Sequence, residues 1–157
     1  MGKFKLLSCL LLLMIGACTE QITPTPYTYT SVFTGAHSKT WTVKFLEQTQ
    51  NGEVAETFKL DACWNDNEYT FYANSEHAFT ATSGAAKCSD TEADVINDTW
   101  GFNNATATLT MVLPFFTESS LPFIVKEAKK GNMQLEIFLD ENNTSSYRIH
   151  FESTSEN

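Results

Sequence analysis

The segment GNMQLEIFLDENNTSSYRIHF (131–151) decides the fold, because two stretches with the same alternation flank one polar turn. In both stretches apolar residues occupy every second position: Met133, Leu135, Ile137 and Leu139, then Tyr147, Ile149 and Phe151. A period of two is typical of a strand that buries one face and exposes the other. The Glu141-Asn142-Asn143 run between them suits a turn. The segment therefore predicts an antiparallel β-hairpin.

The same pattern extends toward the N-terminus. Apolar residues alternate again at Ala107, Leu109, Met111 and Leu113. Turn signals follow at short intervals, at Asn51-Gly52, Asn103-Asn104 and Lys130-Gly131-Asn132. Strands are expected near 40–48, 53–60, 68–73, 77–82, 98–103, 105–113, 121–129, 132–139 and 145–152. No amphipathic helix is expected beyond a short turn around 91–95.

Such a succession of strands predicts an all-β, antiparallel up-and-down barrel of about eight strands. Closure is favoured because it removes unpaired sheet edges. A two-sheet β-sandwich is the alternative. The 157 residues suit one domain, and 42% hydrophobic with 13% aromatic residues are typical of a globular chain. The net charge of −9 argues against nucleic acid as a partner and indicates a solvated acidic surface.

The N-terminus MGKFKLLSCLLLLMIGACTEQ (1–21) has the organisation of a signal peptide. Its apolar run holds about a dozen residues, whereas a bilayer-spanning helix needs about 20. Lys3 and Lys5 supply the basic start, and the small residues Gly16 and Ala17 stand before Cys18. Residues 1–17 are therefore predicted to be a signal peptide that is removed.

Ile15, Gly16, Ala17 and Cys18 resemble the lipobox of bacterial lipoproteins. This resemblance implies cleavage before Cys18 and attachment of a diacylglycerol to its thiol, so the membrane becomes a partner through a lipid anchor. An ordinary secretory leader is the alternative. Thr19 follows where an aspartate can mean inner-membrane retention, which favours the outer membrane and leaves the periplasmic or surface face open.

With Cys9 in the leader and Cys18 lipidated, Cys63 and Cys88 remain as a predicted disulfide. The two flank the turn at 74–77 symmetrically, so the bridge would close the base of one hairpin, which is a structural role. The expected organisation is a lipidated Cys18 and Thr/Pro-rich tether over 18–36, a barrel domain over 37–152 and a disordered tail over 153–157. The aromatic residues of the tether segment could pack back onto the domain.

Three further motifs carry a family resemblance: DACWNDNEYTF (61–71), GAAKC (84–88) and DTW (98–100). Together with Trp41 they resemble lipocalin-like lipoproteins of Bacteroidetes, over about residues 36–152. The matching positions are Trp41, Cys63, Asp66, Tyr69, Thr70, Phe71, Lys87, Cys88, Thr99 and Trp100. The resemblance implies a lipocalin-like barrel, and a late arginine that packs over the first-strand tryptophan. Arg148 with Trp41 is therefore the candidate barrel-closing pair; a solvent-facing Arg148 is the alternative.

Catalytic motifs are not recognisable in this sequence. His37, His77 and His150 are scattered, and no metal-ligand, nucleophile or phosphate-loop spacing occurs. No enzyme activity, metal or cofactor is therefore expected. Trp64 follows Cys63 and either packs against the disulfide or stacks on sugars. Phe115 and Phe116 lie in an expected loop at 114–122 that could flank the barrel mouth, cover its base or touch lipid.

Six aromatic residues are expected to point inward and to fill the barrel or line a ligand cavity: Trp41, Tyr69, Phe71, Phe79, Trp100 and Tyr147. The function that we expect is non-enzymatic binding of a small apolar or amphipathic ligand in the interior of the barrel of a cell-envelope lipoprotein. The alternative is a structural or interaction module of a surface or periplasmic assembly, which binds a protein or glycan through its loops.

Overall fold

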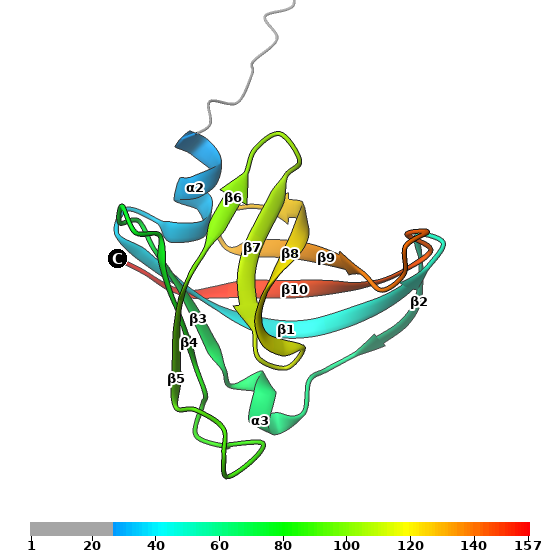
Figure 1. Cartoon of the computed structure of the whole chain (residues 1–157), viewed down its shortest axis with the longest axis horizontal. Helices are drawn as coiled ribbons and strands as arrows, with labels where there is room; N and C mark the ends of the chain where they lie inside the picture. The colour runs from blue at the N-terminus through cyan, green and yellow to red at the C-terminus, as the bar shows by residue number, and fades with distance from the viewer. Residues whose placement is uncertain (1–26) are drawn as a thin grey trace, which may run out of the picture.

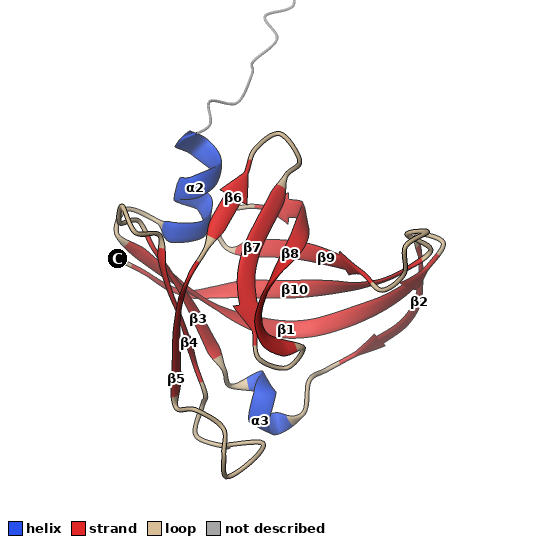
Figure 2. Cartoon of the chain, viewed as in Figure 1, coloured by secondary structure: helices blue, strands red, loops and turns tan. Residues whose placement is uncertain are grey.

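The computed structural model describes residues 27–157. The predicted signal peptide, Cys18 and the first part of the tether lie outside the described residues. The described chain is an antiparallel, nearly closed β-barrel (Figures 1 and 2), which confirms the predicted fold class. Its elements are α2 (Tyr27–Thr34), β1 (Ser38–Gln50), β2 (Glu53–Phe58), α3 (Ala62–Asn65), β3 (Glu68–Tyr72), β4 (Ala78–Thr82), β5 (Val95–Thr99), β6 (Gly101–Asn103), β7 (Thr108–Leu113), β8 (Thr117–Ala128), β9 (Asn132–Phe138) and β10 (Ser145–Glu156).

The strands follow the order β5-β4-β3-β1-β10-β9-β8-β7-β6, and β2 pairs with β1 outside this order. The predicted hairpin at 131–151 is formed by β9 and β10. The long β1 pairs with β10 over its whole length. Along its other edge β1 pairs first with β3 and then, near its end, with β2. Residues 59–67 leave the sheet between β2 and β3, and this excursion contains α3.

One bent segment connects the two ends of the strand order. β5 and β6 are separated only by Trp100, yet β5 pairs with β4 and β6 pairs with β7, at opposite ends of the strand order. At the bend the Trp100 amide donates to the His77 carbonyl (2.9 Å) and the indole Nε1 donates to the Tyr72 carbonyl (3.1 Å). The single strand expected over 98–103 is therefore two short strands that join the sheet to itself. This continuity distinguishes the barrel from the alternative two-sheet sandwich.

The N-terminal boundary of the domain differs from the prediction. Residues up to 36 were expected to form an extended tether, but Tyr27–Thr34 form helix α2. The helix is held because Phe33 is fully buried against Trp100, with ring centroids 6.2 Å apart, and its carbonyl accepts the Trp41 indole N–H at 2.9 Å. Gly35 follows the helix with a φ of +62°, a conformation that suits glycine at a helix end.

The predicted disordered tail over 153–157 is also corrected, because β10 continues to Glu156. The backbone of β1 supplies the partners that order it. The amides of His37 and Ser38 donate to the Asn157 carbonyl, and the Asn157 amide donates to the Ser38 carbonyl. The end of the chain therefore lies beside the start of β1, at the α2 end of the barrel (Figure 1). Neither helix within residues 27–157 has the length and apolar character that a membrane span requires.

Candidate ligand-binding site

The barrel interior is packed with aromatic side chains. Five of the six predicted cavity-lining residues are buried there: Trp41, Tyr69, Phe71, Phe79 and Trp100. The Phe71 ring lies 5.1 Å from Phe79 and 5.8 Å from Trp100, between centroids. Burial raises the pKa of Tyr69 well above its usual range. These five residues fill the barrel by ring-against-ring packing, in contrast to the expected cavity inside it.

The sixth residue, Tyr147, lies at the end of the barrel that carries α3 and borders a cleft of about 410 Å³ there. The cleft is lined by Leu46, Phe58, Lys59, Leu60, Asp61, Trp64, Phe115, Phe116 and Tyr147. These residues come from β1, β2, the excursion that contains α3, the β7–β8 turn and β10. The cleft therefore forms where five separate segments of the chain converge.

Ring contacts hold the aromatic walls of this cleft in place. Tyr147 packs against Phe58 with centroids 5.9 Å apart and rings nearly perpendicular, and against Phe116 with centroids 5.7 Å apart. Phe115 and Phe116 are themselves 4.7 Å apart. β8 begins at Thr117, so the expected loop at 114–122 is a short turn, stabilised by a hydrogen bond from the Phe116 amide to the Leu113 carbonyl. This turn places both phenylalanines at the barrel mouth.

The predicted disulfide between Cys63 and Cys88 fixes the α3 wall of the cleft. It joins α3 to the loop between β4 and β5. Asp66 strengthens the junction, because its carboxylate accepts hydrogen bonds from the amides of Ala85 and Ala86. Gly84 leaves room for this carboxylate, since a Cβ at this position would lie 1.9 Å from the Asp66 carboxyl carbon. Trp64, the neighbour of Cys63, is thereby held in the wall.

Two charged side chains lie at the rim of the cleft, Lys59 and Asp61, and both are exposed. The Asp61 carbonyl accepts hydrogen bonds from the amides of Trp64 and Asn65 at the start of α3. Its carboxylate makes no capping hydrogen bond to the helix. Asp61 is therefore a lining residue whose carboxylate does not cap α3.

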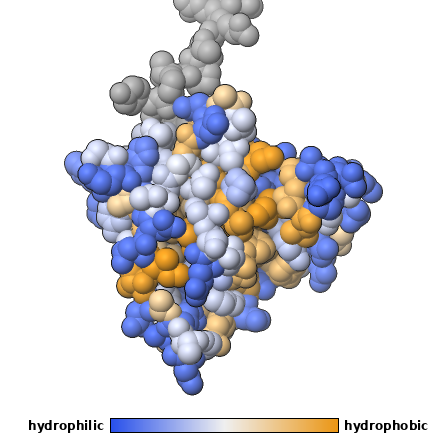
Figure 3. Space-filling model, viewed as in Figure 1, coloured by the Kyte–Doolittle hydropathy of each residue, from blue (hydrophilic) through white to orange (hydrophobic). Residues whose placement is uncertain are grey.

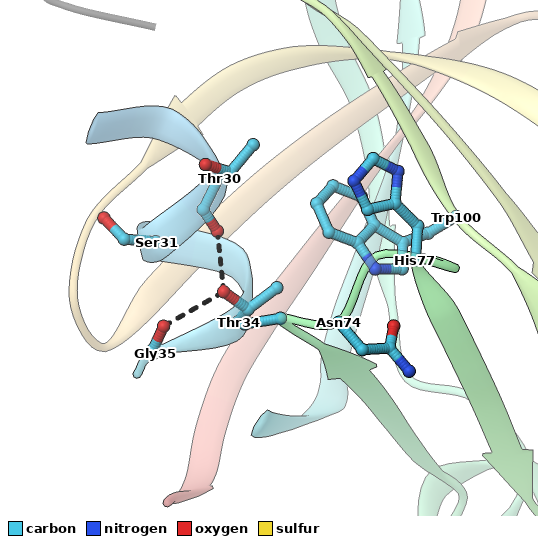
Figure 4. Close-up of a pocket in the computed structure, with 8 residues that line it drawn as sticks. Thr30, Ser31, Thr34, Gly35, Asn74, His77 and Trp100 are labelled. Atoms are coloured by element: carbon cyan, nitrogen blue, oxygen red, sulfur yellow. Dashed lines mark hydrogen bonds between the residues drawn. The ribbon is translucent and has the colours of Figure 1, made fainter. Parts of the chain in front are cut away.

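A second hollow, of about 360 Å³, lies at the opposite end, between α2 and the β3–β4 turn (Figure 4). The His77 ring stacks on Trp100 with centroids 4.7 Å apart and covers it. Polar groups around the hollow form hydrogen bonds within the protein. The Thr34 hydroxyl donates to the Thr30 carbonyl, and the Asn74 Oδ1 accepts a hydrogen bond from the Ala78 amide. This hollow is thus part of the junction that holds α2.

Outside these hollows, the exposed apolar residues lie in separate places on the surface. On the face seen in Figure 3 it occurs in patches among hydrophilic residues. The exposed large apolar residues come from different segments: Val54, Val95, Ile124 and Leu139. Single exposed apolar residues are common on soluble proteins and mark no site by themselves. The aromatic cleft at the α3 end is therefore the candidate site.

The predicted barrel-closing pair of Trp41 and Arg148 is not formed. Lys39 is the cation that lies over the Trp41 ring. Arg148 alternates with the inward Ile149 and points outward, where its Nε donates to Glu136 Oε1 at 3.0 Å. Burial opposes ionisation of Glu136, but hydrogen bonds from Ser146, Arg148 and Lys126 outweigh it, so the pKa of this carboxyl is lowered.

The described residues contain no group of three or more His, Cys, Asp or Glu side chains that could hold a metal ion. His150 belongs to the outer face, where it stacks on Phe45 with centroids 4.0 Å apart and contacts Glu47.

Comparison with known proteins adds no relative to this picture. Neither a protein-family model nor a curated protein matches the chain.

Proposed function

We propose that this protein is a non-enzymatic lipoprotein of the cell envelope that binds a small apolar or amphipathic ligand in the cleft beside α3. The observation that supports the proposal is the convergence of half-buried aromatic side chains on one open cavity of about 410 Å³. That volume lies within the range of roughly 300–1,000 Å³ typical of small-molecule sites. A rim with one carboxylate and one ammonium group suits a ligand with an apolar body and a polar end.

The orientation of the barrel agrees with the proposed anchor. In the proposal Cys18 carries lipid and holds the protein at the outer membrane. The described chain begins at α2, whereas α3 and the β7–β8 turn lie at the opposite end (Figure 1). An anchored barrel would then present its cleft away from the membrane, where a ligand can enter.

Ligand extraction tests the binding proposal. The mature protein should be purified from the native envelope and delipidated, and its non-covalently bound small molecules should be identified by mass spectrometry. A stoichiometric apolar or amphipathic compound is expected. Substitutions Trp64→Ala and Phe116→Ala should abolish its retention, while Val95→Ala, at an exposed site outside the cleft, should not. Equal retention by all variants would place the ligand elsewhere.

Metabolic labelling with palmitate tests the anchor separately. Label is expected on the wild-type chain and should be lost in Cys18→Ser, which should move from the membrane fraction to the soluble fraction. An unlabelled wild-type protein would rule out the lipid anchor without bearing on the cleft.

The filled barrel interior also favours a second candidate, an interaction module that uses its loops. The disulfide-linked loop between β4 and β5 is the segment to alter, because it projects from the α3 end (Figure 1). This candidate requires a stoichiometric envelope partner that is lost when residues 89–91 are replaced by glycine and serine. Retention of the partner by that variant, or recovery of none, would contradict it.

A further inference from the structure

We infer that the cleft selects ligands that carry an organic cation, with a quaternary ammonium group as the best-fitting head. This inference rests on the proposed function, since it specifies the ligand class of the same site. Five aromatic residues border the cavity: Phe58, Trp64, Phe115, Phe116 and Tyr147. They come from β2, α3, the β7–β8 turn and β10, so aromatic rings approach the cavity from several sides.

Aromatic rings attract a cation electrostatically, whereas aliphatic side chains do not. The face of each ring carries partial negative charge, and it attracts a positive group within about 6 Å of its centre. A quaternary ammonium group has no N–H to donate, so it loses little when polar protein partners are few. Its methyl groups also gain from leaving water. The ring contacts described for Tyr147 hold these walls in place.

The rim supplies the matching charge. Asp61 borders the same cavity and is exposed, and its carboxylate makes no capping hydrogen bond to α3. The chain as a whole carries a net charge of −9, which also favours the approach of a cation. Lys59 stands on the same rim and opposes a cation by repulsion. Removal of the Asp61 charge is therefore expected to weaken the binding of a cation, and removal of the Lys59 charge is expected to strengthen it.

A pair of molecules with the same shape and different charge tests the inference. Choline and its neutral carbon analogue 3,3-dimethylbutan-1-ol should be titrated against the mature protein by NMR or calorimetry at low salt. Choline is expected to bind about tenfold more tightly, the size of effect that cation–ring attraction supports in a partly desolvated site.

Variants test whether residues of the cleft cause the preference for choline. Asp61→Asn should weaken choline binding severalfold and leave the neutral analogue unchanged. Asp90→Asn, which removes the same charge from the exposed β4–β5 loop, is the matched control and should change neither affinity. Lys59→Met should tighten choline binding. Trp64→Leu should weaken choline more than the analogue, because it replaces a ring with an aliphatic side chain.

The outcomes separate this inference from the function on which it rests. Equal affinity for choline and its neutral analogue would overturn the inference and leave apolar ligand binding intact. Binding of neither molecule, together with no bound compound after extraction, would overturn both. If Asp61→Asn and Asp90→Asn weakened choline equally, the attraction would come from the overall charge, and the assignment to this cleft would be wrong. Circular dichroism should verify that each variant is folded.

Discussion

The ammonium group of Lys39 lies 4.7 Å from the centre of the Trp41 ring, and both side chains are almost fully buried. The same ammonium contacts the Lys130 carbonyl and the Glu156 carboxylate. One lysine of β1 thus connects the barrel core, the β8–β9 turn and the C-terminal end of β10. A buried cation is tolerated only when it is partnered, and here the ring, the carbonyl and the carboxylate together provide the partners.

Replacement of Lys39 by methionine should lower the free energy of unfolding by about 1–2 kcal/mol, because it removes a hydrogen bond and the cation–ring contact while it keeps the side-chain length. Urea unfolding measures the change. Lys44→Met is the control, since Lys44 and its partner Glu152 are both about half exposed. That change should cost less than about 0.5 kcal/mol. Equal effects of the two substitutions would contradict the role given to Lys39.

Replacement of Phe33 by alanine should cost about 3–5 kcal/mol, because it leaves a cavity in a packed aromatic core. Phe33 packs α2 against Trp100 and Phe71. Tryptophan fluorescence should shift to the red as α2 detaches. The neighbouring Val32→Ala, at a half-buried position, should cost clearly less. An unchanged unfolding midpoint for Phe33→Ala would mean that α2 does not contribute to the fold.

Loss of the disulfide should destabilise the protein substantially. Cys63 and Cys88 are 25 residues apart, and closing a loop of this length restricts the unfolded chain by about 3.5 kcal/mol. The double variant Cys63→Ser with Cys88→Ser should lose about that amount in urea unfolding. Thiol labelling of the unfolded, unreduced mature protein should modify neither cysteine. Labelling at both would show that the bridge does not form.

Protonation of Glu136 at acid pH should lower the stability of the folded protein. Its carboxyl has a lowered pKa in the folded protein, so the stability that this group contributes is complete above its ordinary pKa of about 4.5 and is lost as the pH falls below it. Glu136→Gln should be less stable than wild type at pH 7, because Lys126 and Arg148 lose their carboxylate. The difference should shrink as the pH falls below about 4.5. A constant difference over this range would exclude Glu136 as a source of acid sensitivity.

Periodicity predicts the strands in which buried and less buried positions alternate, whereas β2 has no buried residue and β7 ends in three consecutive buried residues. Met133 and Leu135 point inward in β9 as their alternation predicts, and Ile149 and Phe151 do so in β10. Helix α2 was missed because its residues are threonine-rich and its order depends on contacts with residues distant in sequence, such as the packing of Phe33 on Trp100 and the hydrogen bond from Trp41. The order of the last residues likewise depends on β1, which is remote in sequence.

The candidate site was only partly predictable from the sequence. Tyr147 and the disulfide were identified, and Phe115 and Phe116 were recognised as residues that could flank a barrel mouth. Whether inward aromatic residues fill a barrel or line a cavity depends on their packing, which alternation does not reveal. The site also depends on residues 59–67 leaving the sheet, so Leu60 and Asp61 meet rings that lie more than fifty positions away in the sequence. No local pattern signals that meeting.

The bend at Trp100 has a consequence for the mutational tolerance of the chain. Residues 95–103 are in register with β4 on one side of the bend and with β7 on the other. An insertion or deletion of one residue here would exchange inward and outward side chains either where β5 pairs with β4 or where β6 pairs with β7. Single substitutions at exposed positions such as Val95 keep both registers. We therefore expect this segment to accept changes of residue identity far more readily than changes of length.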